Sequence, residues 1–185
     1  RVSHENLRLR DRIWLENMES EFAINASGNA TQNPISPMFT PFSLRKMKLV
    51  NRVAVSPMAM YSAEDGKVSD FHLVHYGSRA LGGAGLIFTE MTHVSKEARI
   101  TPRCKGMYNE EHRQGWKRIV DFVHQQSEAK IALQLGHAGP KGSTKILWEG
   151  QNTALEEGWP IVGPSAVSYK DQIPHALTKP EMRVI

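Results

Sequence analysis

Apolar residues follow two kinds of spacing along the chain, short continuous runs and a helical repeat. Short apolar runs bounded by turn residues are typical of buried strands, and apolar residues every three to four positions indicate helices. Strands are predicted at residues 52–56, 85–90 and 131–135, and helices at 71–81 and 109–128. Apolar strands that alternate with helices form parallel sheets covered by helices, so the pattern predicts an α/β fold.

The amino-terminal part follows a different pattern. Residues 3–23 predict an amphipathic helix capped by Ser3, which we expect to dock on a neighbouring domain or subunit. Its apolar face is predicted to comprise Leu7, Trp14, Met18 and Phe22. Residues 25–37, rich in small and polar side chains, indicate a linker. Two short alternating segments, 42–44 and 47–50, then predict a β-hairpin.

The third predicted strand is followed by a long segment, 136–177, rich in Gly and Pro. Thr178 and Glu181 form a capping-box pattern that predicts the start of a further helix. A doubly wound sheet and a (β/α)8 barrel both fit this order of elements. A complete barrel needs about 250 residues, so three strands predict at most a partial barrel.

Composition narrows the function classes. The chain has 185 residues, 40% hydrophobic and 23% charged, and a net charge of +4 without a long basic stripe, which disfavours nucleic-acid binding. No apolar run approaches the ~18 residues of a membrane span, and no signal-peptide pattern is present. Cys104, the only cysteine, permits no internal disulfide, which fits a reducing, cytoplasmic location. An ordinary loop thiol is favoured over a reactive one.

Candidate chemistry gathers where the predicted strands end. The strands lead into Ser56-Pro57-Met58-Ala59, Thr89-Glu90-Met91 and Gln134-Leu135-Gly136-His137. The carboxyl ends of parallel strands meet on one face, where α/β folds bind ligands. With strands about 4.8 Å apart, three such ends fit a ligand the width of a fused ring system. Gln134 is expected to be buried, with its amide bonded to backbone or to a heterocycle edge.

Other suggestive patterns have ordinary explanations. His72 and His75 are spaced for metal chelation, but no third ligand stands at a suitable spacing, so packing histidines are favoured and no metal site is predicted. The glycines of residues 82–85 follow a predicted helix and precede a strand. A dinucleotide fingerprint needs the reverse order, so they indicate a helix terminator.

Four motifs, in order, resemble the old yellow enzyme family. They are Ser56–Ser62 (SPMAMYS), Phe71–Ile87 (FHLVHYGSRALGGAGLI), Arg99–Thr101 (RIT) and Gln134–Gly139 (QLGHAG). The family comprises FMN-dependent NAD(P)H oxidoreductases and ene-reductases on (β/α)8 TIM barrels. The resemblance covers about residues 38–185, the first part of such a barrel, with some three of its strands.

The resemblance also implies roles for individual residues. Ser56, Pro57, Met58 and Ala59 would line the FMN ring, Met91 would lie beside it, Gln134 would bond its pyrimidine edge, and Tyr61 and His137 would face the substrate. NAD(P)H would reduce the flavin, which would pass hydride to an activated alkene or a related acceptor. Ala59 stands where many relatives have a cysteine or threonine that tunes the flavin potential. The family's paired catalytic histidines, or histidine and asparagine, are expected beyond Ile185, so no catalytic residue is assigned here.

Residues 3–11 and 139–144 further resemble the bifunctional salicylyl-CoA and 2-aminobenzoyl-CoA monooxygenase/reductases. Residues 1–36 would then be linker and the tail of an upstream FAD monooxygenase module, and 37–185 the FMN-binding barrel. An aromatic acyl-CoA acceptor and a homo-oligomeric parent protein are implied. The chain, which begins at Arg1 and ends in a predicted helix start, reads as an excerpt expected to be inactive alone. The competing hypothesis is an incompetent, truncated barrel that acts at most as an interaction module.

Overall fold

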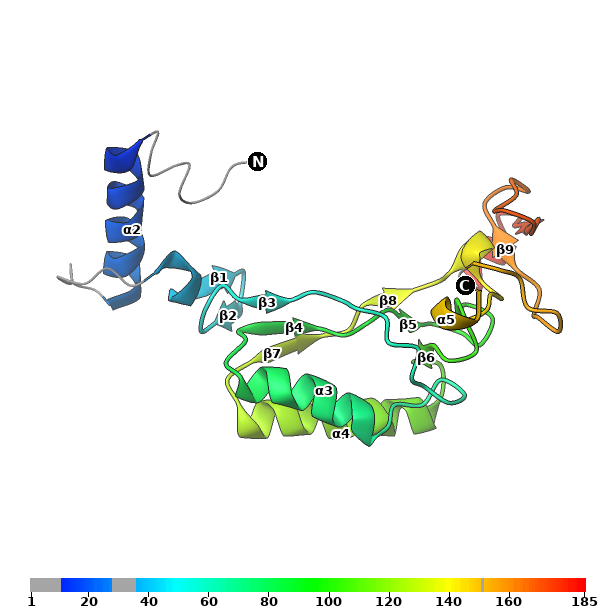
Figure 1. The fold of residues 1–185 in the computed structure, drawn as a ribbon, viewed down its shortest axis with the longest axis horizontal. Helices are drawn as coiled ribbons and strands as arrows, with labels where there is room; N and C mark the ends of the chain where they lie inside the picture. The colour runs from blue at the N-terminus through cyan, green and yellow to red at the C-terminus, as the bar shows by residue number, and fades with distance from the viewer. Residues whose placement is uncertain (1–10, 28–35, 151) are drawn as a thin grey trace.

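The amino-terminal helix lies apart from the rest of the fold in the computed structural model, which describes residues 11–27, 36–150 and 152–185. Helix α2 spans Arg12–Ser27, so it continues into the segment predicted as linker (Figure 1). The predicted cap and the first turns at residues 3–10 lie outside the described residues. Arg52 lies 4.5 Å from the centre of the Phe22 ring, near the carboxyl end of α2. Trp14, at the other end, is 48% exposed, so the described part of this chain does not cover the predicted apolar face there, and docking on a neighbouring domain or subunit stays a prediction.

The predicted hairpin is confirmed. A 3-10 turn, η1 (Pro37–Phe39), precedes it. Strands β1 (Phe42–Leu44) and β2 (Met47–Leu49) pair antiparallel with Leu44 opposite Met47. This register leaves a two-residue turn, in which Arg45 has a φ of 54°. A left-handed residue in this place suits the right-handed twist of the two strands.

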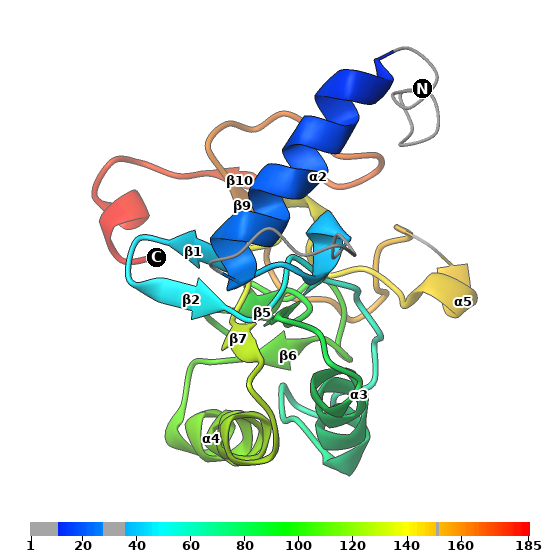
Figure 2. The ribbon, with the colours of Figure 1, turned by 90° about the vertical axis from the view of Figure 1, so that its left-hand side faces the viewer.

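The central sheet has the predicted parallel arrangement. Strands β3 (Ala54–Val55), β4 (Leu86–Phe88) and β7 (Lys130–Ala132) pair in the order β3-β4-β7. Helices α3 (Asp70–Leu81) and α4 (Glu110–Gln126) lie side by side on one side of these strands (Figures 1 and 2). Each helix follows one strand and precedes the next, so the unit is two consecutive βα crossovers.

A single apolar cluster joins the two helices to the sheet. Its largest members are Tyr76, Ile87, Trp116 and Ile119, all almost fully buried. The helices approach closely at Gly77, where a Cβ atom would come 2.7 Å from the ring of Phe122. Burial of large aromatic and aliphatic side chains is the main source of stability in such a unit.

The amino-terminal ends of both helices are capped by nearby side chains that bond to the backbone. The backbone N–H of Ser69 donates to Nδ1 of His72 at 2.9 Å, and Oδ1 of Asn109 accepts from the N–H of His112 at 2.8 Å. These bonds satisfy groups that have no partner within the helix. The predicted starts of both helices are therefore confirmed.

A second parallel sheet was not predicted from the sequence. It has the order β6-β5-β8 and consists of β5 (Thr92–His93), β6 (Lys105–Gly106) and β8 (Leu135–Gly136). Each strand has two residues, too few to produce a hydrophobic period. The strand predicted at residues 131–135 is thus divided between β7 and β8.

The segment predicted as a long loop contains short elements. They are η2 (Gly139–Lys141), α5 (Leu147–Gly150), β9 (Val162–Gly163) and β10 (His175–Ala176), and β9 and β10 pair in parallel. Thr178 donates to Glu181 as predicted, with 2.7 Å between its nitrogen and Oε2, but only the 3-10 turn η3 (Glu181–Arg183) follows. Within the described residues, no helix is both long and apolar enough to cross a membrane.

Candidate functional site

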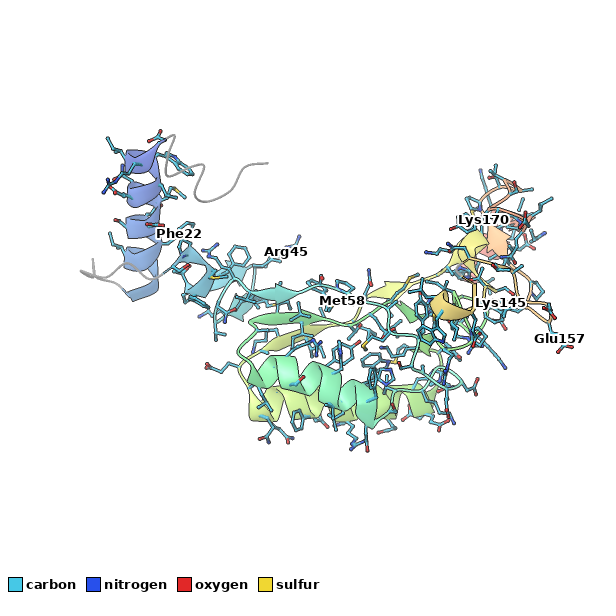
Figure 3. All side chains as sticks on the ribbon, viewed as in Figure 1. Phe22, Arg45, Met58, Lys145, Glu157 and Lys170 are labelled. Carbon is cyan, nitrogen blue, oxygen red and sulfur yellow. The ribbon has the colours of Figure 1, made fainter. Side chains whose placement is uncertain are left out.

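The segment after β3, residues 56–60, lies mostly exposed at the end of the central sheet, and we call it the ledge. Residues 56–60 belong to no helix or strand. The first four, Ser56, Pro57, Met58 and Ala59, are all exposed. Met58, 45% exposed, lies on the side of the strands away from α3 and α4 (Figure 3). The backbone at the end of the ledge is held in place, because the N–H of Met60 donates to Oε2 of Glu90 at 3.0 Å.

The second strand end lies directly beside this ledge. Residues 89–91 connect β4 to β5. Thr89 in this connection and Thr92 at the start of β5 both donate their hydroxyl groups to the carbonyl of Glu90 at 3.0 Å. Met91 is half-buried between them and its side chain lies over Gly136, where a Cβ atom would overlap it. Glycine at residue 136 therefore leaves the space that Met91 occupies.

The third strand end is bonded to the second through Gln134. Its backbone N–H donates to Oγ1 of Thr89 at 3.1 Å, and its carbonyl accepts from the N–H of Thr92 at 2.7 Å. The prediction that three strand ends converge is thereby confirmed. The prediction that the Gln134 side chain is buried is wrong, because the residue is exposed. Its amide makes no hydrogen bond within the described part of the chain, so both amide groups are free for a ligand.

Tyr61 lies beyond the ledge, in a backbone conformation with a φ of 49°. Its ring makes an edge-on contact with Trp148, with 6.1 Å between ring centres. Partial burial raises the pKa of its phenol, so the hydroxyl stays protonated at neutral pH. It shares a small recess with Lys141 and Lys145.

His137 lies after β8 and lines a different recess from Tyr61. Its Nδ1 accepts from the N–H of Gly139 at 3.0 Å, and burial lowers the pKa of the ring. It borders an apolar cavity of about 190 Å³ with Val162, Leu177 and Met182. The structure therefore does not bring His137 and Tyr61 into one cavity, although both follow strand ends.

A buried charged cluster behind the ledge was missed by the sequence analysis. Nζ of Lys105 donates to Oε1 of Glu90 and, at 3.1 Å, to the hydroxyl of Tyr76. Burial lowers the pKa of Lys105 and raises the pKa of Tyr76, while the adjacent carboxylate of Glu90 favours the charged ammonium. A charged residue in a two-residue strand gives no sequence pattern, so no signal pointed to this cluster.

The remaining titratable candidates have structural surroundings. His72 is fully buried at the start of α3, and His75 is half-buried one turn later. Cys104 is also buried, 3.3 Å from the hydroxyl of Thr101. Among residues 11–27, 36–150 and 152–185, no group of three or more histidine, cysteine, aspartate or glutamate side chains can hold a metal ion.

The three strand ends fit one face of a flat heterocyclic cofactor such as FMN. The ledge offers backbone and the thioether of Met58, and Gln134 offers a free donor and acceptor at the neighbouring strand end. Flavins are held by an apolar contact to the ring and by hydrogen bonds to its polar edge. The described residues thus have the chemistry that one wall of a flavin site needs.

The sequence matches the NADH:flavin oxidoreductase / NADH oxidase family over residues 37–183. An NADPH dehydrogenase of Bacillus cytotoxicus is 39% identical over 150 residues, which are 79% of this chain and 39% of that protein. An NADH:flavin oxidoreductase of Gibberella zeae is 38% identical over 153 residues, 78% of this chain and 37% of that protein. The chain thus spans about two fifths of the length of these curated relatives.

Solved structures agree with these sequence relatives. Morphinone reductase in complex with tetrahydroNAD superposes with a TM-score of 0.67 at 28% identity, over 81% of this chain and 43% of that one. The old yellow enzyme of Trypanosoma cruzi superposes with a TM-score of 0.65 at 28% identity, over 80% and 44%. Such neighbours are TIM barrels, so the predicted fold class, a partial (β/α)8 barrel, is confirmed.

Proposed function

The chain belongs to the NADH:flavin oxidoreductase / NADH oxidase family, the family of the old yellow enzymes, and on this premise we propose that its protein is an FMN-dependent NAD(P)H oxidoreductase. FMN, when bound, would accept hydride from NAD(P)H and deliver it to a second substrate. The residues described here would form one wall of the FMN site. The match begins at residue 37, which supports a boundary between the amino-terminal helix and the barrel after residue 36.

One observation carries this proposal. Three strand ends that are far apart in sequence are joined by hydrogen bonds, the first to the second through the Glu90 carboxylate and the second to the third through Thr89 and Thr92. They present an exposed ledge beside an amide that has no partner among the described residues. An exposed amide without a protein partner is ordinary, but one at the carboxyl end of a parallel strand lies where α/β barrels bind ligands.

Each residue of this wall has a task that follows from its chemistry. Met58 and the backbone of residues 56–59 would contact the ring, and Met91 would contact it from the next strand end. Gln134 would donate to and accept from the pyrimidine edge, which fixes the orientation of the ring. Tyr61, protonated at neutral pH, would offer a hydrogen bond to a substrate above the ring. We propose His137 as a second substrate contact, reached through its own cavity.

The acceptor is the finer part of the proposal. An activated alkene is the acceptor implied by the family, and an aromatic acyl-CoA is implied by the resemblance of residues 139–144 to the bifunctional reductases. Lys141 and Lys145 line the recess beside Tyr61 and place positive charge there. This charge supports an acceptor with an anionic group.

The experiment starts with the protein purified as its gene encodes it. We expect bound flavin, visible by its absorbance and released as FMN on denaturation, and oxidation of NADPH or NADH when an acceptor is added. Cyclohexenone and an aromatic acyl-CoA, tested side by side at equal concentration, separate the two classes of acceptor.

Two results would contradict the proposal, one its cofactor and the other its reaction. A folded protein that is colourless, and whose intrinsic fluorescence does not change when FMN is added to 100 μM (about 100 times a micromolar Kd), is not a flavoenzyme. If flavin binds and neither nicotinamide reduces it, FMN binding stands and the oxidoreductase activity is wrong.

A further inference from the structure

We propose that Glu90 is the positioning residue of the cofactor wall, and that its buried partner Lys105 holds the Glu90 carboxylate where it binds the end of the ledge. The inference deepens the proposed function and rests on it. It assigns a role to two buried residues that are not themselves predicted to contact a ligand.

Glu90 is fixed at every polar group that it has. Its N–H donates to the hydroxyl of Tyr76 at 3.0 Å, and its carbonyl accepts from the hydroxyl groups of Thr89 and Thr92. One carboxylate oxygen accepts from Lys105 and the other accepts from the N–H of Met60. A carboxylate held on both sides has one position, and Met60 is held in place with it.

Both side chains of the Lys105–Glu90 pair are buried. The side chain of Lys105 is 0% exposed and that of Glu90 is 2% exposed. Nζ of Lys105 also lies 5.3 Å from the centre of the Tyr76 ring and 5.7 Å from that of Trp116. Buried ion pairs contribute little net stability, because desolvation offsets the attraction between the charges. A purely apolar core would serve the fold as well, so the pair needs a role besides stability.

The backbone around Glu90 indicates what this role is. Residues 56–59 run along the ledge directly to Met60, whose N–H is bonded to Glu90. Met91 follows Glu90 in sequence, and Gln134 is bonded through its backbone to Thr89 and Thr92. All three predicted contacts to the cofactor ring therefore meet at the connection around Glu90. A shift of its carboxylate would move the ledge relative to the other two strand ends.

The test compares two double variants that differ in one group. Glu90→Gln with Lys105→Met removes both charges but keeps an amide oxygen that accepts from Met60. Glu90→Leu with Lys105→Met removes the charges and that acceptor as well. Neither leaves an unpaired buried charge, and leucine and glutamine are similar in size. Ile119→Val is the control for stability alone, because it removes a buried methyl group from the apolar cluster and leaves every hydrogen bond of Glu90 in place.

Two quantities are measured for each variant, hydrogen exchange of the Met60 amide in flavin-free protein and the Kd for FMN. A hydrogen bond to a buried acceptor protects an amide and fixes its segment. We expect the leucine variant to exchange Met60 at least about tenfold faster and to bind FMN about tenfold more weakly than the glutamine variant. Ile119→Val should lower the thermal midpoint with Met60 exchange and FMN affinity unchanged.

Equal exchange and equal affinity in the two double variants would overturn the inference. If the leucine variant does not fold, the wild type decides, because a Met60 amide that exchanges as fast as in an unstructured peptide is not held by Glu90. A wild type that binds no FMN would refute the proposed function, while the exchange comparison would still decide whether Glu90 positions the ledge.

Discussion

The two sides of the central strands differ in how their side chains are satisfied. On the helix side, Trp116 and Tyr76 are buried and every polar group of Glu90 has a partner within the chain. On the ledge side, Met58 and Gln134 are exposed, and the Gln134 amide has no partner among the described residues. The helix side buries its large side chains against the sheet, and the ledge side leaves the Gln134 amide without a partner in the described part of the chain.

This difference separates stability from binding. A buried, largely apolar face stabilises the fold, whereas an exposed face with free polar groups contributes little to folding and remains available for a ligand. Substitutions on the helix side should therefore change stability, and substitutions on the ledge side should change cofactor affinity.

The largest effect is expected for Trp116→Ala. Trp116 is 2% exposed in the apolar cluster, and its Nε1 donates to the carbonyl of Gly106 at 3.2 Å. Removing the ring leaves a cavity and an unpaired buried carbonyl, so we expect a loss of about 3–5 kcal/mol in the free energy of unfolding. Urea unfolding followed by circular dichroism measures it. A loss below about 1 kcal/mol would show that the helix side does not stabilise the fold.

Acid should also weaken the helix side, through His72. Burial lowers the pKa of His72 to about 3, with nearby Lys105 a further cause, so the folded state holds the ring neutral. The unfolded state protonates near pH 6.5. His72 therefore stabilises the fold fully above pH 6.5, and this stability is lost as the pH falls from 6.5 towards 3, by at most about 1.4 kcal/mol per pH unit.

The variant His72→Gln isolates this group from the other histidines. Its unfolding free energy should fall less steeply between pH 6 and 4 than that of the wild type, because one fewer proton is bound on unfolding. Identical slopes would mean that His72 is solvated in the folded state.

The sequence predicted the helix side well because its signals are local. The starts of α3 and α4 follow from Ser69 and Asn109, and the three parallel strands follow from short apolar runs. Helix α2 was placed less well, because the contact that covers part of it involves Arg52, distant in sequence. The strands β5, β6 and β8 are set by pairing with neighbours, which no two-residue pattern reveals.

The candidate site was predictable in its location but not in its support. Parallel strands require their carboxyl ends to meet, so the convergence of residues 56–59, Met91 and Gln134 follows from topology alone. The bond from Glu90 to Met60 depends on the position of one carboxylate in three dimensions. The exposure of Gln134 was missed because a polar residue in an apolar strand suggests a buried partner.

On the ledge side, Gln134→Leu should change cofactor affinity and leave stability unchanged. The lost amide would remove hydrogen bonds to the flavin edge, so we expect FMN to bind about tenfold more weakly. Because the residue is exposed, the free energy of unfolding should stay within about 0.5 kcal/mol. The matched control is Gln125→Leu, the same substitution at an exposed residue of α4. Equal FMN affinity in both variants would remove Gln134 from the site.

The smallest effect on stability is expected for Trp148→Ala, the counterpart of Trp116→Ala. Trp148 is 63% exposed, and its ring contacts Tyr61 only edge-on, at 6.1 Å between centres. Truncation opens no buried cavity, so the free energy of unfolding should change by less than about 0.5 kcal/mol. The same urea series measures both tryptophans. A loss above about 2 kcal/mol would mean that the loop after β8 is packed as tightly as the helix side, and the division between the two faces would fail.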